Sequence, residues 1–541
     1  MTARTLTEAL TAASNPVVLH GPRGTVTRAS SWAELDHLST GAARHLLSLG
    51  LARGARVGLM ADTDLDFLRL FLGCQKACLL PVPLPLPNAF GDRAAHAEKL
   101  ELQLRAAGAV AAVAADAHAG LLPATLPLRL TPADLDRTPP FRGALPAVGP
   151  DDVAFLQFSS GSTRFPKGVM ISQRAVMANA RAIRDGLAVV PGDVTVSWLP
   201  LYHDMGLVGC VLAPLVAGLE LHLLPTREFV RNPAVWPRLM SDVGGTLSYS
   251  PGFGYELAAR RAATAGLDLA RWRVAGIGGD MIRPEVLRAF AEAFRPAGFR
   301  DGALVPSYGL AEATLAVTMT PPGRGLAVEE VDLDRLERDG IALPPGPGAR
   351  ARVFSRCGVP LPGTELRVVD AVGRPLGDRR VGRVQLRSPS VMEGYFREPE
   401  ETARVLEARG WLDTGDLGAL VDGELIVTGR AKDVIIVNGR NLWPQDLEWA
   451  AERVEPLRSG DVAAVPHHGD GGEQVVLLVQ CRVPDPTQRE RLVEALVARV
   501  MATSGVLCRV VLVPPRSLPR TSSGKLARAQ ARRLLTDGVF G

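Results

Sequence analysis

The chain has 541 residues, which is too long for a single hydrophobic core, so two or more domains are expected. Hydrophobic residues make up 47% and charged residues 22%, which is ordinary for a globular protein with a substantial core. The net charge of +4, from 61 basic and 57 acidic residues, is too small to indicate a nucleic-acid partner.

The cysteines and the apolar stretches indicate the cellular compartment of the protein. Six cysteines are widely spread without paired zinc-finger spacing, which favours a reduced, cytoplasmic protein. The first ten residues contain no apolar signal core. The most apolar long stretch runs from Leu207 to Pro225, and its proline, glutamate and histidine would be costly in lipid. We therefore expect no membrane span and predict a buried helix and strand there.

Short apolar runs alternate with helical patterns through most of the chain. Strand-like runs begin near Val57 and Ala109, and the segment from Arg283 has apolar residues at helical spacing. This alternation predicts an α/β fold of mixed sheets and helices, with largely parallel sheets. The pattern restarts after Gly429, so we predict a large N-terminal domain over 1–429 and a small α/β domain over 430–541.

A segment rich in serine, glycine and threonine lies between two strand-like runs, from Phe155 to Gln173. Small residues leave backbone N–H groups free, and these can cradle phosphate oxygens. It is not a Walker loop, because G-x4-G-K-[ST] is absent and a strand-like run follows. Taken alone, it fits a surface hairpin as well. Its candidate phosphate-binding residues are Ser159, Ser160, Gly161, Ser162, Thr163 and Lys167.

Three motifs in the middle of the chain each have a structural alternative. SWLPLYHDMGL contains His203, and a single histidine of this kind is more often structural than catalytic. GIGGDMIRPE, from Gly276, is one glycine short of a dinucleotide fingerprint and also suits a tight turn. PSYGLAEAT places Tyr308 beside a glycine with Glu312 just beyond, where a lone acid is usually a helix N-terminal charge.

The later part of the chain contains a break in the α/β pattern and two charged residues that are candidates for the site. From Thr320 to Arg350, clusters of proline and glycine bracket a short charged segment, which predicts an excursion outside the core. Asp416 lies between two glycines, where a carboxylate can accept hydrogen bonds from a ribose diol. Lys525 follows a Ser-Ser-Gly turn within a basic run from Arg516 to Arg533, which a solvated face also explains.

The order and spacing of these motifs resemble the adenylate-forming superfamily of acyl-CoA synthetases, peptide-synthetase adenylation domains and luciferases. The resemblance extends from about Ser31 to Arg533. SWLPLYHDMGL, YGLAEAT, the stretch GRAKD running into GRNLWPQDLE, and TSSGK are most similar to the fatty acyl-AMP ligase branch. The resemblance implies ATP and Mg²⁺ as cofactors and a mobile small domain.

The resemblance also implies roles for the motif residues. Binding of ATP is implied for the phosphate-loop residues named above and for Gly278, Gly279, Asp280, Tyr308, Gly309, Leu310, Ala311, Asp416 and Arg430. Catalytic roles are implied for Lys525, Glu312 and His203, with Glu312 also holding Mg²⁺. Lys432 matches the hinge between the domains, and Met205, Val208 and Phe253 lie near the expected acyl pocket. Arg164, Gln173 and Gly252 depart from the residues usual in the superfamily.

The function implied is ATP-dependent activation of a fatty or other apolar carboxylic acid to acyl-AMP, with release of pyrophosphate. The acyl group would then pass to the phosphopantetheine thiol of an acyl carrier protein acting in trans. The excursion from Thr320 to Arg350 looks like the insertion of the acyl-AMP ligase branch, which restrains the small domain. An acyl-CoA synthetase using CoA is the alternative, and a catalytically dead nucleotide-binding homologue is a third.

Overall fold

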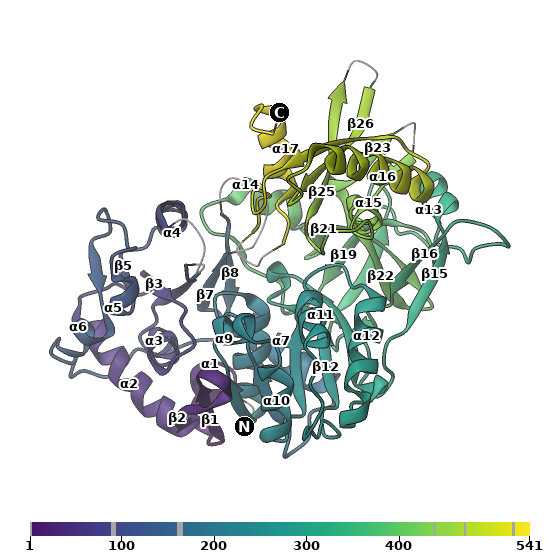
Figure 1. The fold of residues 1–541 in the computed structure, drawn as a ribbon. Helices are drawn as coiled ribbons and strands as arrows, with labels where there is room; N and C mark the ends of the chain where they lie inside the picture. Colours follow the sequence, from purple (N-terminus) through teal and green to yellow (C-terminus); the bar gives the residue numbers. More distant parts are fainter. Residues whose placement is uncertain are drawn as a thin grey trace.

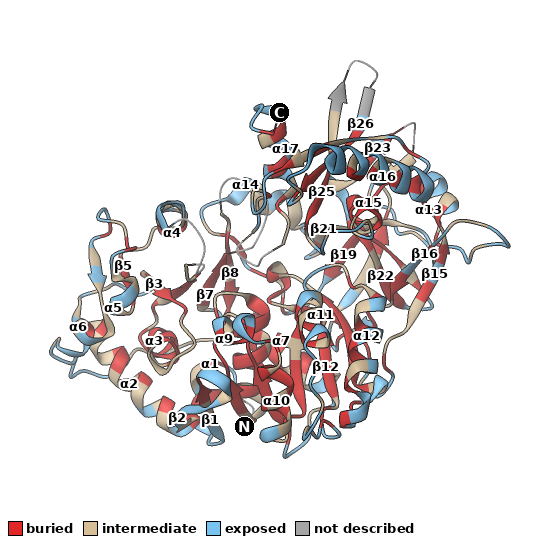
Figure 2. Ribbon diagram, viewed as in Figure 1, coloured by how far each residue is buried: buried red, intermediate tan, exposed pale blue. Residues whose placement is uncertain are grey.

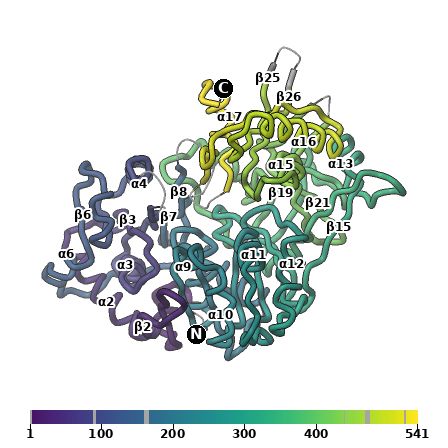
Figure 3. Tube along the Cα trace, in the orientation of Figure 1, coloured from purple at the N-terminus to yellow at the C-terminus, as the bar shows by residue number. Residues whose placement is uncertain are grey.

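The computed structural model describes residues 3–87, 93–158, 166–437, 440–469, 472–521 and 525–540. It is an α/β fold in which the C-terminal segment lies across the top of the molecule, over the larger N-terminal part (Figures 1 and 3). Within these described ranges, helices that combine the length and the apolar character needed to cross a membrane do not occur.

A nine-stranded sheet forms the centre of the large N-terminal part, in the order β17-β14-β13-β12-β11-β9-β10-β1-β2. The run from β13 to β1 is parallel, and the edge strands are antiparallel. Figure 2 shows these strands buried among the surrounding helices. Their bounds are β1 Pro16–His20, β2 Val26–Ser31, β9 Val194–Ser197, β10 Glu220–Leu223, β11 Leu247–Ser250, β12 Val274–Ile277, β13 Leu304–Gly309, β14 Ala316–Met319 and β17 Val359–Pro360.

Two smaller sheets complete the first half of the chain. A parallel sheet has the order β4-β3-β5-β6, with β3 Arg56–Met60, β4 Leu80–Leu84, β5 Ala111–Val113 and β6 Leu128–Leu130. An antiparallel sheet has the order β20-β8-β7, with β7 Val153–Phe158, β8 Gly168–Ser172 and β20 Gly394–Tyr395. The strand predicted after the phosphate loop is therefore present as β8.

The prediction of largely parallel sheets is wrong for the later part of the chain. There an antiparallel sheet has the order β18-β19-β21-β22, with β18 Glu365–Val369, β19 Gly382–Arg387, β21 Leu412–Val421 and β22 Glu424–Arg430. The last two strands are joined by Asp422-Gly423, both at positive φ, which is the turn chemistry of a tight hairpin. A connection this short leaves no room for the crossover helix that parallel pairing of these two strands would need.

The sequence predicted that the excursion from Thr320 to Arg350 lies outside the core, but part of it is buried. It contains β15, Val328–Asp332, and α13, Leu333–Asp339, and β15 pairs with β16, Ala351–Ser355. Val331 and Leu336 are buried in a cluster with residues of β21 and β22. Four apolar residues of the segment belong to this cluster, namely Val331, Leu333, Leu336 and Ala342, and the surrounding prolines and glycines hid their pattern in the sequence.

Helices cover the sheets, and several begin at a capping side chain. The Ser172 side chain accepts a hydrogen bond from the Ala175 amide, so the chain turns directly from β8 into α7. The predicted helix after Arg283 is present, as is the predicted helix and strand between Leu207 and Pro225. The helices of this part are α1 Leu6–Ala12, α2 Trp32–Ser48, α3 Leu65–Lys76, α4 Arg93–Ala107, α5 Asp116–Ala119, α6 Pro132–Asp136, α7 Gln173–Gly186, the π-helix η2 Met205–Leu212, α8 Ala213–Ala217, α9 Thr226–Arg231, α10 Val235–Asp242, α11 Gly252–Arg260, α12 Pro284–Phe294 and α14 Pro399–Val405.

The C-terminal segment has hydrophobic clusters of its own, on the two faces of one sheet. That sheet has the order β25-β26-β27, with β26 and β27 parallel. A separate hairpin, β23 with β24, precedes it. The elements are β23 Ile435–Val437, β24 Arg440–Leu442, α15 Pro444–Ala451, β25 Val462–Gly469, β26 Gly472–Gln480, α16 Pro486–Ser504, β27 Cys508–Val513 and α17 Arg528–Thr536.

Candidate active site

A cavity of about 360 Å³ lies beyond the carboxyl ends of the parallel strands β9, β11, β12 and β13. Ligands of parallel α/β sheets bind at this edge. The β21–β22 hairpin and the C-terminal segment also contribute to the wall, so distant parts of the chain meet there. The predicted site residues that line it are Lys167, His203, Met205, Gly278, Gly279, Tyr308, Gly309, Leu310, Ala311, Glu312, Asp416, Arg430, Lys432 and Lys525.

The turn between β13 and β14 carries two of these residues to the cavity. The pairing register shifts between Tyr308 and Gly309, which is a bulge of the kind that redirects side chains. A Cβ atom on Gly309 would lie 1.9 Å from the carbonyl oxygen of Leu315, so only glycine fits. The 3-10 turn η5, Ala311–Ala313, follows directly and holds Glu312 in the wall.

Asp416 lies between an aromatic hydroxyl and a guanidinium. The Tyr308 hydroxyl donates a hydrogen bond of 2.7 Å to one carboxylate oxygen, and Arg430 Nε lies 3.4 Å from the other. Asp416 and Arg430 are cross-strand partners in the β21–β22 hairpin, which explains their proximity. Burial raises the pKa of Asp416, and the charge of Arg430 opposes that shift. Each oxygen keeps a lone pair for a ligand.

Glu312 faces a second tyrosine that the sequence did not single out. The Tyr395 hydroxyl donates a hydrogen bond of 2.8 Å to Glu312 Oε1. Lys167 Nζ lies 5.0 Å from the centre of the Tyr395 ring and 2.5 Å from Glu401 Oε2. Burial raises the pKa of Glu312, while the Tyr395 hydrogen bond opposes the shift. Tyr395 therefore fixes the orientation of the candidate metal-binding carboxylate.

His203 is paired with the residue that follows it. His203 Nδ1 lies 2.6 Å from Asp204 Oδ1, and the same oxygen accepts a hydrogen bond of 2.7 Å from the Met205 amide. Burial raises the pKa of Asp204, but His203 and the Met205 amide outweigh burial, so the pKa is lowered. The charge of Lys525 acts on Asp204 in the same direction, so the small domain's lysine lies near this pair.

The cavity is rich in positive charge. Lys167, Arg430, Lys432 and Lys525 all line it. The pKa of Lys432 is lowered, chiefly by burial and to a smaller extent by the charge of Arg430. The Lys525 ammonium makes no hydrogen bond or ion pair with any residue in the described part of the chain. Four cations from three segments of the chain fit a ligand with several negative charges, such as a nucleoside triphosphate.

The remaining predicted residues are not among those that the structure places in the cavity wall. Ser159 to Thr163 fall outside the described residues. Asp280 is exposed and accepts from the Met281 amide at 2.8 Å, beyond the turn after β12. Val208 is fully buried within the core around the π-helix η2. Phe253, near the start of α11, is 43% exposed, and its ring is edge-on to that of Trp198.

A hydrophobic part of the wall also escaped the sequence analysis. We call it the apolar branch, and it consists of Ile183, Gly209, Tyr249, Leu315, Ala316 and Met319. Most of these residues belong to one hydrophobic cluster between α7, α8 and the strands β11 to β14. No sequence motif marks these residues, because they are ordinary core residues. They line a cavity only because the tertiary structure leaves space beside them.

Glu312 is suited to a metal held mainly by a substrate. In the described part of the chain, no group of three or more histidine, cysteine, aspartate or glutamate side chains is arranged to hold a metal. Mg²⁺ usually takes one or two carboxylates and completes its octahedron with water and substrate phosphates. A single carboxylate oriented by Tyr395 fits that mode and does not fit a metal bound by protein alone.

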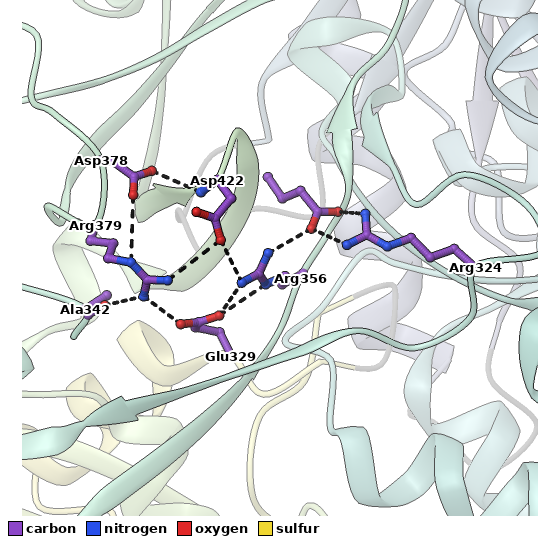
Figure 4. Close-up of polar contacts among 8 residues, drawn as sticks. Arg324, Glu329, Ala342, Arg356, Asp378, Arg379 and Asp422 are labelled. Atoms are coloured by element: carbon purple, nitrogen blue, oxygen red, sulfur yellow. Dashed lines mark hydrogen bonds and ion pairs between the residues drawn. The ribbon is translucent and has the colours of Figure 1, made fainter. Parts of the chain in front are cut away.

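Ion pairs fix the excursion to the large domain (Figure 4). Glu329 of β15 accepts hydrogen bonds of 2.5 Å from Arg356 and 2.6 Å from Arg379. Arg356 also reaches Asp422 at the tip of the β21–β22 hairpin, at 3.2 Å. Burial raises the pKa of Glu329, but the two guanidinium groups outweigh it and lower the pKa. The network therefore joins the excursion to the sheet that carries Asp416.

The other side of the excursion contacts the small domain. Helix α13 packs against β24. Glu337 of α13 accepts hydrogen bonds from Arg440, through both Nε at 2.9 Å and a terminal nitrogen. Arg350 donates to the Thr503 carbonyl at 3.0 Å, and Arg352 lies 2.9 Å from Asp446. The excursion thus links the two parts of the molecule through buried charges.

Comparisons with known proteins agree with this arrangement. The profile of the AMP-binding enzyme family matches residues 9–396. A Caulobacter vibrioides protein that carries the name of an acyl-CoA synthetase is 47% identical, covering 99% of this chain and 96% of its own. A long-chain-fatty-acid–AMP ligase of Mycobacterium marinum is 34% identical, covering 94% and 92%.

A solved structure is similar over the whole chain. It comes from a study of fatty acyl-adenylate ligases from E. coli and L. pneumophila. The TM-score is 0.95 at 41% identity, with 99% of this chain and 98% of the other covered. The large and small parts described above therefore belong to a known arrangement of adenylate-forming enzymes.

Proposed function

Because this chain belongs to the AMP-binding enzyme family, we propose that it activates a fatty or similarly apolar carboxylic acid as acyl-AMP and passes the acyl group to a thiol. The observation that carries the proposal is the meeting of Lys525, from the C-terminal segment, with Tyr308, Glu312 and Asp416 in one cavity. These residues supply what adenylation requires: a nucleoside site, a metal-binding carboxylate and a mobile cation.

In the first step the acid's carboxylate attacks the α-phosphorus of ATP, and pyrophosphate leaves. Both reactants are anions, so the site must neutralise charge and hold them in line. Lys525 binds the carboxylate and α-phosphate oxygens, and Lys167 faces the departing phosphates. Asp416 and Arg430 hold the ribose, and Tyr308 stacks on the adenine. None of these residues forms a covalent bond with the substrate.

The family uses ATP with Mg²⁺. In our proposal Glu312, oriented by Tyr395, holds the ion together with the phosphates of ATP. When bound, Mg²⁺ supplies positive charge that offsets the phosphate charge. The apolar branch receives the acid's chain, and its composition excludes a strongly charged substrate tail. His203, held by Asp204, faces the same space and contacts the reacting carboxylate.

For the second step we propose a carrier protein's phosphopantetheine thiol as acceptor, with residues 430–541 turning about Lys432 on the domain of residues 1–429. The bridge from Glu329 to Glu337 through the excursion supports this choice, because it stabilises the adenylating arrangement. A carrier protein can offset that stabilisation by binding the turned domain selectively, over a larger surface than free CoA presents. The names of the relatives leave CoA as the alternative acceptor.

The cytoplasm is the proposed location, since all six cysteines are free thiols in a chain with no disulfide among them. Acid-dependent exchange of pyrophosphate into ATP tests the whole proposal. We expect exchange with apolar acids and its loss without Mg²⁺. Failure with every apolar acid would favour a nucleotide-binding homologue without activity, and rapid consumption of CoA would favour an acyl-CoA synthetase.

A further inference from the structure

Two hydroxyl groups interrupt the otherwise hydrophobic surface that receives the acid. Tyr249 belongs to the apolar branch, and Ser307 lies beside it in the cavity wall. Their neighbours there include Ile183, Leu315 and Met319, none of which can form a strong hydrogen bond. A polar pair in such a wall is the kind of feature that selects a ligand.

The parallel sheet brings the two hydroxyls together. Tyr249 on β11 pairs with Gly276 on β12, and Gly276 pairs with Val305 on β13. Ser307 is two residues beyond Val305, so it faces the same side of the sheet. A Cβ atom on Gly276 would lie 2.2 Å from the Tyr249 ring, so the ring lies directly over the glycine. Because Gly276 on β12 has no side chain, Tyr249 can extend across that strand to β13.

Within the described chain, the Tyr249 hydroxyl has only long contacts. Ser307 Oγ is 3.4 Å away, and Met319 Sδ is 3.6 Å away. The neighbouring Tyr255 shows the usual pattern, since its hydroxyl donates to the Gly276 carbonyl at 2.9 Å. Tyr249 is half-buried in the cavity wall, so a bound ligand that replaces these long contacts with a short hydrogen bond would gain affinity.

The two groups offer one donor and one acceptor. Ser307 Oγ donates its own hydrogen to the Val305 carbonyl at 3.1 Å, which leaves its lone pairs free to accept. The Tyr249 hydroxyl is free to donate into the cavity. A ligand hydroxyl can accept from Tyr249 and donate to Ser307 at once. A ketone can use only the Tyr249 donor, and a methylene group can use neither.

We infer that the preferred acid carries a hydroxyl group on its hydrocarbon chain, bound between Tyr249 and Ser307. The inference rests on the proposed function and adds a substrate class to it. Both residues are specificity determinants that contact the chain of the acid away from the reacting carboxylate.

The test compares acids of one chain length in acid-dependent ATP–pyrophosphate exchange. The set holds the unsubstituted acid, its hydroxy isomers with the hydroxyl at successive carbons, and the matching oxo acids. We expect one hydroxy isomer to exceed the unsubstituted acid about tenfold in kcat/KM, the effect of one buried hydrogen bond. Tyr249→Phe and Ser307→Ala should each bring the ratio of kcat/KM for that isomer to kcat/KM for the unsubstituted acid down to about one.

Tyr255→Phe is the matched control, because it removes a buried tyrosine hydroxyl that does not line the cavity. It should lower Tm without changing the preference. Equal use of the unsubstituted acid and every hydroxy isomer would overturn the inference and leave the proposed function intact. Retention of the preference by Tyr249→Phe would also overturn it. Absence of exchange with every acid would overturn both.

Discussion

Glu337 offers a sharp test of how the excursion controls the small domain. It lies on α13, its side chain is 4% exposed, and its carboxylate meets Arg440 of the small domain and Arg350. Deleting the excursion would be a poor test, because Val331 and Leu336 would be lost from a buried cluster. Glu337→Gln removes the charge and keeps the shape.

The expected size follows from the contacts. A hydrogen bond between charged groups contributes about 1.5–3 kcal/mol, and the amide of glutamine retains part of it. If the contact between the domains is weakened by about 2 kcal/mol, the equilibrium between the adenylating and thioester-forming arrangements shifts roughly 30-fold. If the thioester-forming arrangement holds about 1% of the molecules, the variant would raise it to about a quarter.

The assay measures acyl-CoA formation and pyrophosphate exchange on the same preparations. We expect Glu337→Gln to raise the rate of acyl-CoA formation by about tenfold or more, with exchange within about twofold of the parent. Glu330→Gln is the matched control, since Glu330 is exposed on β15 of the same excursion. Unchanged acyl-CoA formation by Glu337→Gln, with normal exchange, would refute the restraining role of this contact.

Three further variants test the cavity and the hinge. Lys525→Ala should lower exchange by about 10²–10³ with an unchanged circular dichroism spectrum, and exchange within a few-fold of the parent would remove Lys525 from the chemistry. Asp416→Ala should weaken ATP binding measured by calorimetry, by about 1.5–3 kcal/mol for each ribose bond lost. An unchanged dissociation constant would make Asp416 a structural partner of Tyr308 alone. Lys432→Pro should spare exchange and block thioester formation, because proline fixes φ where the chain must turn, while Lys432→Ala should permit both. Normal thioester yield from the proline variant would place the hinge elsewhere.

The alternation of apolar runs and helical patterns predicted the α/β fold, and the family resemblance of the motifs predicted half of the residues that line the cavity. The turns that hold Tyr308, Glu312 and Asp416 depend on glycines and small residues close in sequence, so each motif contains its own geometry. Their order along the chain then indicates an adenylate-forming enzyme. The dipeptide Asp422-Gly423 is a hairpin signal for the antiparallel pair β21–β22. The alternation of strand-like and helical runs favoured parallel sheets instead, so the sequence analysis did not predict this pair.

Contacts between distant segments were decided only by the tertiary structure. Tyr395 reaches Glu312 because β20 pairs with β8, a contact that no spacing rule predicts. Phe253 and Tyr249 are both aromatic and close in sequence, yet α11 turns one outward while Gly276 gives the other room to enter the apolar branch. Side-chain direction depends on which neighbouring strand leaves space, and that is a property of packing between strands that local sequence does not contain.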